Sequence, residues 1–103
     1  MDEVMRTKLL LIREQLLAEG VVILGIFGSR ARGDFRPNSD LDILYRLEDA
    51  FYEKNFSWGG VGRIEEIRNE IEALLGLAVD LADLDALRQG ARDSILPEII
   101  YVA

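Results

Sequence analysis

A glycine-serine turn between two apolar segments constrains this chain more than any other sequence feature. Residues 21–27, VVILGIF, form a short apolar run rich in β-branched residues, which predicts a buried strand. Gly28-Ser29 follows directly, and we expect a short helix to open at Ser29. Glycine lets the backbone approach a ligand closely, and the free N–H groups that open a helix attract anions. The turn therefore predicts a phosphate-binding loop at the end of a strand.

Two aspartates, one residue apart, begin a second predicted strand at residues 40–47. Because side chains alternate between the faces of a strand, Asp40 and Asp42 share one face. Carboxylates this close repel each other unless a cation lies between them. Solvent exposure at a strand end is the structural alternative, but the neighbouring turn makes us favour a divalent cation such as magnesium. The opposite face is the predicted core face and carries Leu41, Ile43, Tyr45 and Leu47.

A third predicted strand, residues 77–82, carries one further aspartate. Asp80 lies inside an apolar run, where burial of a carboxylate is costly without a partner. Asp83 and Asp85 compete with it, but aspartate at a strand exit commonly caps a following helix. We therefore choose Asp80 as the third acidic site residue and assign the other two to capping.

The order of these segments resembles the minimal nucleotidyltransferases of the DNA polymerase beta superfamily. The matching stretches are residues 28–33 (GSRARG), 36–42 (RPNSDLD) and 79–81 (VDL). The resemblance runs over nearly the whole chain and implies an α/β fold, a small mixed β-sheet with helices packed on it. It also implies an enzyme that transfers a nucleoside monophosphate from a triphosphate to an acceptor.

The resemblance gives each candidate site residue an expected role. Catalysis and the binding of Mg²⁺, with two ions expected, fall to Asp40, Asp42 and Asp80. Asp80 is also the candidate base for the acceptor hydroxyl. Binding of the substrate ATP falls to Gly28, Ser29, Arg30, Arg32 and Ser39. Arg30 and Arg32 point in different directions on a helix, so the choice between them as a phosphate ligand stays open.

Composition excludes several other classes. The 103 residues, half of them hydrophobic, predict one nucleotidyltransferase domain over residues 1–103, too small for a processive polymerase. The chain has neither cysteine nor histidine, so no thiolate or histidine zinc site is possible. A net charge of −7 disfavours direct binding of nucleic acid. We see no signal peptide or membrane-spanning run and expect a cytoplasmic protein.

The acceptor has no evident binding domain in so short a chain, and we expect another protein to share that site. Proteins of the resembled family are typically encoded with a HEPN-domain partner, often an RNase toxin. The resemblance implies an antitoxin that forms a hetero-oligomer with such a toxin and transfers AMP to a hydroxyl, expected on tyrosine. The alternatives are an antitoxin that neutralises its toxin by binding alone, and nucleotidyl transfer to a small molecule.

The remaining segments supply helices and connections. Residues 2–19 and 61–75 have apolar side chains at helical spacing, with glycine as the predicted stop at 20 and 76. Residues 48–60 lack a period and predict a loop. Its aromatics either pack on the core, which we favour for Phe51 and Phe56, or contact a nucleotide base or a partner. From residue 84 we expect short helical turns broken at Gly90, then an edge strand or helix end at 99–102.

Overall fold

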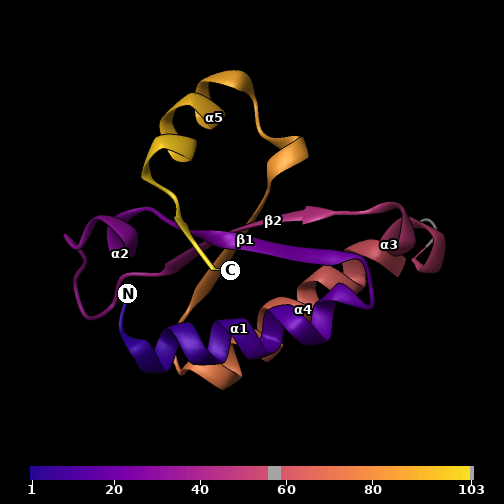
Figure 1. Cartoon of the computed structure of the whole chain (residues 1–103), viewed down its shortest axis with the longest axis horizontal. Helices are drawn as coiled ribbons and strands as arrows, with labels where there is room; N and C mark the ends of the chain where they lie inside the picture. Colours follow the sequence, from indigo (N-terminus) through magenta and orange to yellow (C-terminus); the bar gives the residue numbers. More distant parts are fainter. Residues whose placement is uncertain (56–58, 103) are drawn as a thin grey trace.

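A mixed β-sheet lies at the centre of the computed structural model, which describes residues 1–55 and 59–102 (Figure 1). Within those residues the sheet has four strands in the order β3-β2-β1-β4. The strands are β1 (Val21–Phe27), β2 (Leu41–Leu47), β3 (Val79–Asp83) and β4 (Ile100–Tyr101). β1 pairs antiparallel with β2 and β4, whereas β2 and β3 are parallel. The predicted α/β class with a small mixed sheet is confirmed.

Two long helices, α1 (Glu3–Leu17) and α4 (Gly59–Leu75), pack side by side on one face of the sheet (Figure 1). On the other face, α5 (Gln89–Ile95) stands in an arch between β3 and β4 (Figure 1). The shorter helical elements are α2 (Ser29–Arg32), α3 (Asp49–Lys54), the 3₁₀ turn η1 (Leu84–Ala86), α5 (Gln89–Ile95) and the 3₁₀ turn η2 (Leu96–Glu98). None of the described helices has the length and apolarity needed to cross a membrane.

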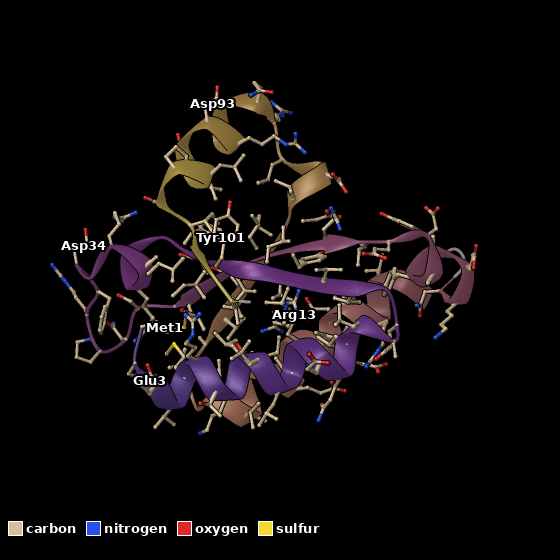
Figure 2. The ribbon with its side chains drawn as sticks, viewed as in Figure 1. Met1, Glu3, Arg13, Asp34, Asp93 and Tyr101 are labelled. Atoms are coloured by element: carbon tan, nitrogen blue, oxygen red, sulfur yellow. The ribbon has the colours of Figure 1, made fainter. Side chains whose placement is uncertain are left out.

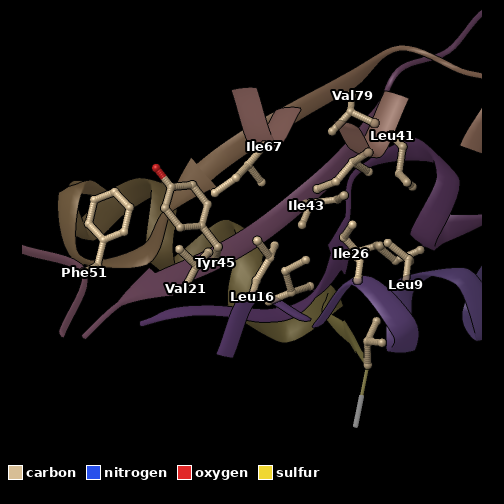
Figure 3. Packing of buried hydrophobic residues seen from close by; sticks show 14 residues of the cluster. Leu9, Leu16, Val21, Ile26, Leu41, Ile43, Tyr45, Phe51, Ile67 and Val79 are labelled. Carbon is tan, nitrogen blue, oxygen red and sulfur yellow. The ribbon is translucent and has the colours of Figure 1, made fainter. Parts of the chain in front are cut away.

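The hydrophobic core fills the space between the sheet and the two long helices (Figure 3). It contains the predicted core face of β2, with Leu41 and Ile43 fully buried and Tyr45 nearly so. Leu9 of α1 and Ile71 of α4 are also fully buried against it. Burial of each such side chain contributes about 2 kcal/mol relative to leaving it in water. This burial fixes the register of β2 and hence the face on which its aspartates lie.

A bulge in β1 explains why its buried residues do not alternate strictly. The register between β1 and β2 shifts between Ile23 and Gly25, so Ile23 and Ile26 both reach the core. Arg13 of α1 donates from Nε to the carbonyl oxygen of Ile23 at 3.2 Å, beside the bulge. Gly25 lies so close to the backbone of Ile100 that an added Cβ would overlap the carbonyl oxygen of Ile100. Glycine at the bulge therefore lets β4 pair with β1.

Two of the predicted connections are wrong. Residues 48–60 include α3 and the first two residues of α4 instead of forming a continuous loop. Helix α3 buries a single side chain, Phe51, and one apolar residue gives no helical period to read. Phe51 packs in the core as predicted, while Phe56 and Trp58 lie outside the described residues. Gly90 lies inside α5, because an exposed helix tolerates glycine at a cost of about 1 kcal/mol.

The turn that follows α1 is tied to α4 by an ion pair that should make stability depend on pH. Arg63 donates from Nε and Nη2 to the two carboxylate oxygens of Glu19 at 2.7 and 2.6 Å. These hydrogen bonds hold the pKa of Glu19 below its ordinary value of 4.5. A carboxylate with a lowered pKa stabilises the fold above its unfolded-state pKa, and this contribution is lost as pH falls through the folded-state pKa.

We therefore expect Glu19→Gln to lower the free energy of unfolding by about 1 kcal/mol at neutral pH. The difference from wild type should shrink as pH falls below 4.5. Urea denaturation at several pH values measures both effects. Glu66→Gln is the matched control, because Glu66 contacts the same Arg63 at 3.2 Å but is more exposed. An equal loss in both variants, or a difference that does not vary with pH, would contradict this assignment.

Candidate active site

The turn after β1 has the backbone conformation that the glycine-serine pair predicts. Gly28 has φ 77° and ψ −160°, a combination that is essentially restricted to glycine. Its carbonyl oxygen accepts hydrogen bonds from the N–H groups of Ala31 and Arg32 at 3.1 and 3.0 Å, which start α2. Gly33 ends α2 in the left-handed conformation, with φ 89°. The predicted turn and short helix are therefore confirmed.

Gly28 lies directly against Asp42. Phe27, the last residue of β1, pairs with Asp42 of β2 across the antiparallel ladder. A Cβ built on Gly28 would overlap the Oδ2 atom of Asp42, so the lack of a side chain lets the turn and the carboxylate approach each other. The turn and the aspartate strand thus meet at one end of the sheet.

Asp42 and Asp80 lie side by side on neighbouring parallel strands, since Asp42 of β2 pairs with Asp80 of β3. The pKa of Asp42 is raised above 3.8, first by partial burial and then by the negative charges of Asp80 and Asp40. Asp40 precedes β2 and is exposed, as is Asp80 on the edge strand β3. Asp80 does not bear the cost of burial, because the edge strand leaves its side chain open to solvent.

These carboxylates suit a hard divalent cation by chemistry and by charge, since Mg²⁺ prefers oxygen ligands. The mutual repulsion that raises the pKa of Asp42 is the repulsion that a cation would relieve. Across residues 1–55 and 59–102, no three His, Cys, Asp or Glu side chains are gathered closely enough to hold a metal ion as they stand. Asp42 and Asp80 are the pair from which such a site would be built.

The two aspartates assigned to capping have different contacts. Asp83 caps η1 as predicted, because its Oδ1 atom accepts from the Asp85 N–H at 3.0 Å. The Asp85 carboxylate instead lies 3.6 Å from Arg92 Nη2 on α5. Only the first of these two capping predictions is confirmed.

Arg30 is committed to the loop between α2 and β2. Its Nε donates to the carbonyl oxygen of Ser39 at 2.9 Å, and its Nη2 donates to that of Pro37 at 3.3 Å. The guanidinium also stacks on the ring of Phe35, 4.6 Å from the ring centre. The Ser39 hydroxyl accepts from the N–H of Arg36 at 2.9 Å. Arg30 and Ser39, both predicted to bind nucleotide, thus hold this loop in shape.

Arg32 is the arginine whose charge reaches the acidic residues of the site. Its positive charge opposes the rise in the pKa of Asp42 and so partly offsets the repulsion from the other acidic groups. Its Nη1 lies 3.2 Å from Glu98 Oε2, and its Nε lies 3.3 Å from Asp34 Oδ2. The structure therefore separates two arginines that the sequence left equivalent.

Glu98 is a residue of this site that the sequence reasoning missed. It belongs to η2, and its Oε1 atom accepts from the N–H of Gly28 at 3.0 Å. Seventy positions separate the two residues. They meet because β4, which follows η2, pairs with Gly25 and Ile26 near the end of β1 that leads into Gly28. The available signal was an acidic residue just before a predicted edge strand, and such a residue is usually a solvated one.

A separate hollow of about 430 Å³ lies at the opposite end of β2, against α3 and α4. Its lining includes Tyr45, Tyr52 and Asp83. Burial first, and then the charge of Asp83, raise the pKa of Tyr45 to about 12. Tyr52 is 55 % exposed, which leaves the predicted choice between packing and ligand contact open for this aromatic.

An α/β sheet in which a glycine-serine turn meets paired carboxylates on neighbouring strands defines a class, the nucleotidyltransferases. Residues 7–102 match the model of the nucleotidyltransferase domain family, and the chain belongs to that family. It is therefore a nucleotidyltransferase, as the sequence predicts.

The relatives agree with this membership. The chain is 36% identical over 83 residues to the protein adenylyltransferase MntA of Thermococcus cleftensis, covering 81% of this chain and 76% of the relative. A solved structure described as a minimal nucleotidyltransferase aligns with TM-score 0.72 and 31% identity over 97% of this chain and 95% of that one. A crystal structure of a toxin-antitoxin with AMP-PNP aligns with TM-score 0.73 and 19% identity over 95% of this chain and 72% of that one. The last supports the fold alone. The resemblance to the minimal nucleotidyltransferases is confirmed.

Proposed function

We propose that this nucleotidyltransferase transfers AMP from ATP to a hydroxyl group of a toxin protein, and that it acts as the antitoxin of that toxin. The acceptor we propose is a tyrosine of a HEPN-domain RNase, modified in the cytoplasm within a hetero-oligomer. The similarity to a protein adenylyltransferase supports the type of reaction. The observation that carries the proposal is the position of Asp42, against Gly28 on one side and paired with Asp80 on the other.

In this proposal Asp40, Asp42 and Asp80 hold Mg²⁺, with two ions expected. When bound, the metal neutralises phosphate charge and increases the nucleophilicity of the acceptor oxygen. The bond that forms joins the acceptor oxygen to the α-phosphorus of ATP. The bond that breaks joins the α-phosphorus to the oxygen that bridges to the β-phosphorus, which leaves as part of pyrophosphate. The proton of the acceptor hydroxyl passes to Asp80, the candidate base.

The chain's own groups bind and orient the substrate. The Gly28 N–H and Ser29 face the triphosphate, and the guanidinium of Arg32 stabilises the charge that develops on the leaving pyrophosphate. Arg30 acts indirectly, because it holds the loop that leads into β2. Asp80 is exposed, so a hydroxyl carried by a separate protein can reach it. A small acceptor would need an additional binding surface for specificity.

The test is incubation of the protein with a HEPN-domain partner, Mg²⁺ and ATP labelled at the α-phosphorus. We expect the label to appear on the partner, and to be absent when chelator replaces Mg²⁺. Label on an added small molecule instead of the partner would favour the alternative acceptor class. Neutralisation of the toxin without any label would favour an antitoxin that works by binding alone.

A further inference from the structure

The carboxylate of Glu98 engages two groups that the proposed function reserves for phosphate. Its Oε1 atom accepts from the Gly28 N–H at 3.0 Å. Arg32 Nη1 donates to Oε1 and Oε2 of the same carboxylate at 3.3 and 3.2 Å. A backbone N–H together with a guanidinium is the donor set that binds carboxylates and phosphates alike. Glu98 thus makes the contacts expected of a bound anion.

The local charge argues against Glu98 and a nucleotide phosphate occupying these donors together. Glu98 accepts from the N–H of Gly28, and Gly28 lies directly against Asp42, which pairs with Asp80. Arg32 is the guanidinium that contacts the Glu98 carboxylate. A triphosphate that arrived with Glu98 in place would compete for the same guanidinium and would add like charge beside three carboxylates.

The segment that carries Glu98 is lightly packed. Residues 84–98 form η1, α5 and η2, and none of these elements contributes a buried residue. The segment arches over the face of the sheet away from α1 and α4 (Figure 1). Its continuation is firmly held, because Val102 is fully buried and donates to the carbonyl oxygen of Leu24 at 3.0 Å. Segments with few buried contacts open at low free-energy cost, so Glu98 can leave the turn while β4 stays paired.

We infer that Glu98 occupies the position of a nucleotide phosphate in the nucleotide-free protein, and that binding of the triphosphate displaces it. The inference rests on the proposed function, because it assumes that Gly28 and Arg32 bind the triphosphate. Glu98 thereby sets the nucleotide concentration at which the site fills.

The experiment measures dissociation constants for ATP with Mg²⁺ by titration calorimetry. Glu98→Ala should bind about tenfold more tightly than wild type, because no charge-assisted contact has to be broken first. Glu98→Gln, which keeps an acceptor oxygen but removes the charge, should fall between the two. Asp93→Ala is the matched control, because this substitution also removes one negative charge from the same segment. Asp93 lies on α5, away from the turn, and its carboxylate accepts a hydrogen bond from Gln89 (Figure 2). Its affinity should equal that of wild type.

Inorganic triphosphate in the presence of chelator is the second probe, because it tests displacement without base or metal. The same order of affinities is expected. If Glu98→Ala keeps the wild-type melting temperature but binds equally or more weakly, the inference is overturned and Glu98 is a positioning residue for Arg32. If Glu98→Ala is unstable, Glu98→Gln decides by the same criterion. Failure of wild type and all variants to bind either probe would overturn the proposed function together with the inference.

Discussion

Replacement of Gly28 by alanine is expected to lower the free energy of unfolding by about 3 kcal/mol and to abolish nucleotidyl transfer. Two costs add. The backbone at Gly28, φ 77° and ψ −160°, is strained for any residue with a Cβ. The new methyl group would also overlap the Oδ2 atom of Asp42 and push this carboxylate from its position beside the turn. Chemical denaturation and the labelled-ATP assay measure the two effects separately.

Gly33→Ala is the matched control, because both glycines flank α2 with positive φ. Gly33 has φ 89°, but a Cβ added there would meet no neighbouring atom within 4 Å. This variant should lose only the cost of the left-handed conformation, about 1 kcal/mol, and should keep its activity. Equal losses of stability and activity in both variants would show that backbone strain alone explains the glycine at position 28.

Asp42→Asn is expected to reduce the rate of nucleotidyl transfer by about a thousandfold while slightly stabilising the fold. The pKa of Asp42 is raised, so the charged form is disfavoured in the folded protein at neutral pH. The causes are partial burial and the negative charges of Asp80 and Asp40. A neutral side chain of similar shape avoids both costs and should raise the melting temperature by about 2 °C. Asp85→Asn, away from the turn and facing Arg92, controls for the loss of one exposed charge.

Asp80→Asn separates chemistry from nucleotide binding. If Asp80 acts on the acceptor hydroxyl, this variant should lose transfer but largely keep its affinity for ATP. Equal loss of both would give Asp80 a structural role instead. Transfer at the wild-type rate by Asp42→Asn would contradict the assignment of the carboxylate pair altogether.

Local sequence signals predicted the arrangement of Gly28, Asp42 and Asp80 in the candidate site, because each of these positions depends on its neighbours in the chain. The apolar run before Gly28 predicts β1. The turn that follows β1 needs a positive φ at position 28, which glycine adopts readily. The alternation in β2 places Asp42 opposite the core face, and Asp80 has the matching parity in β3. Parity decides the face on which each aspartate lies, and the adjacent parallel pairing of β2 with β3 then brings the two carboxylates side by side.

Features that depend on distant contacts could not be predicted in the same way. Arg30 and Arg32 differ only because one reaches the loop carbonyls and the other reaches Glu98. Glu98 itself enters the site through the pairing of β4 with β1, which no local pattern specifies. Helix α3 depends on the burial of one side chain, Phe51, and a single apolar residue has no periodicity.

The intact mass of a HEPN-domain partner co-expressed with this protein tests most directly whether the chain transfers AMP to that partner. The expected result is a partner heavier by one or more AMP units with the wild-type chain, and an unmodified partner with Asp42→Asn. An unmodified partner from cells in which the wild-type protein nevertheless abolishes toxicity would contradict it. So would a partner that carries AMP with the Asp42→Asn variant.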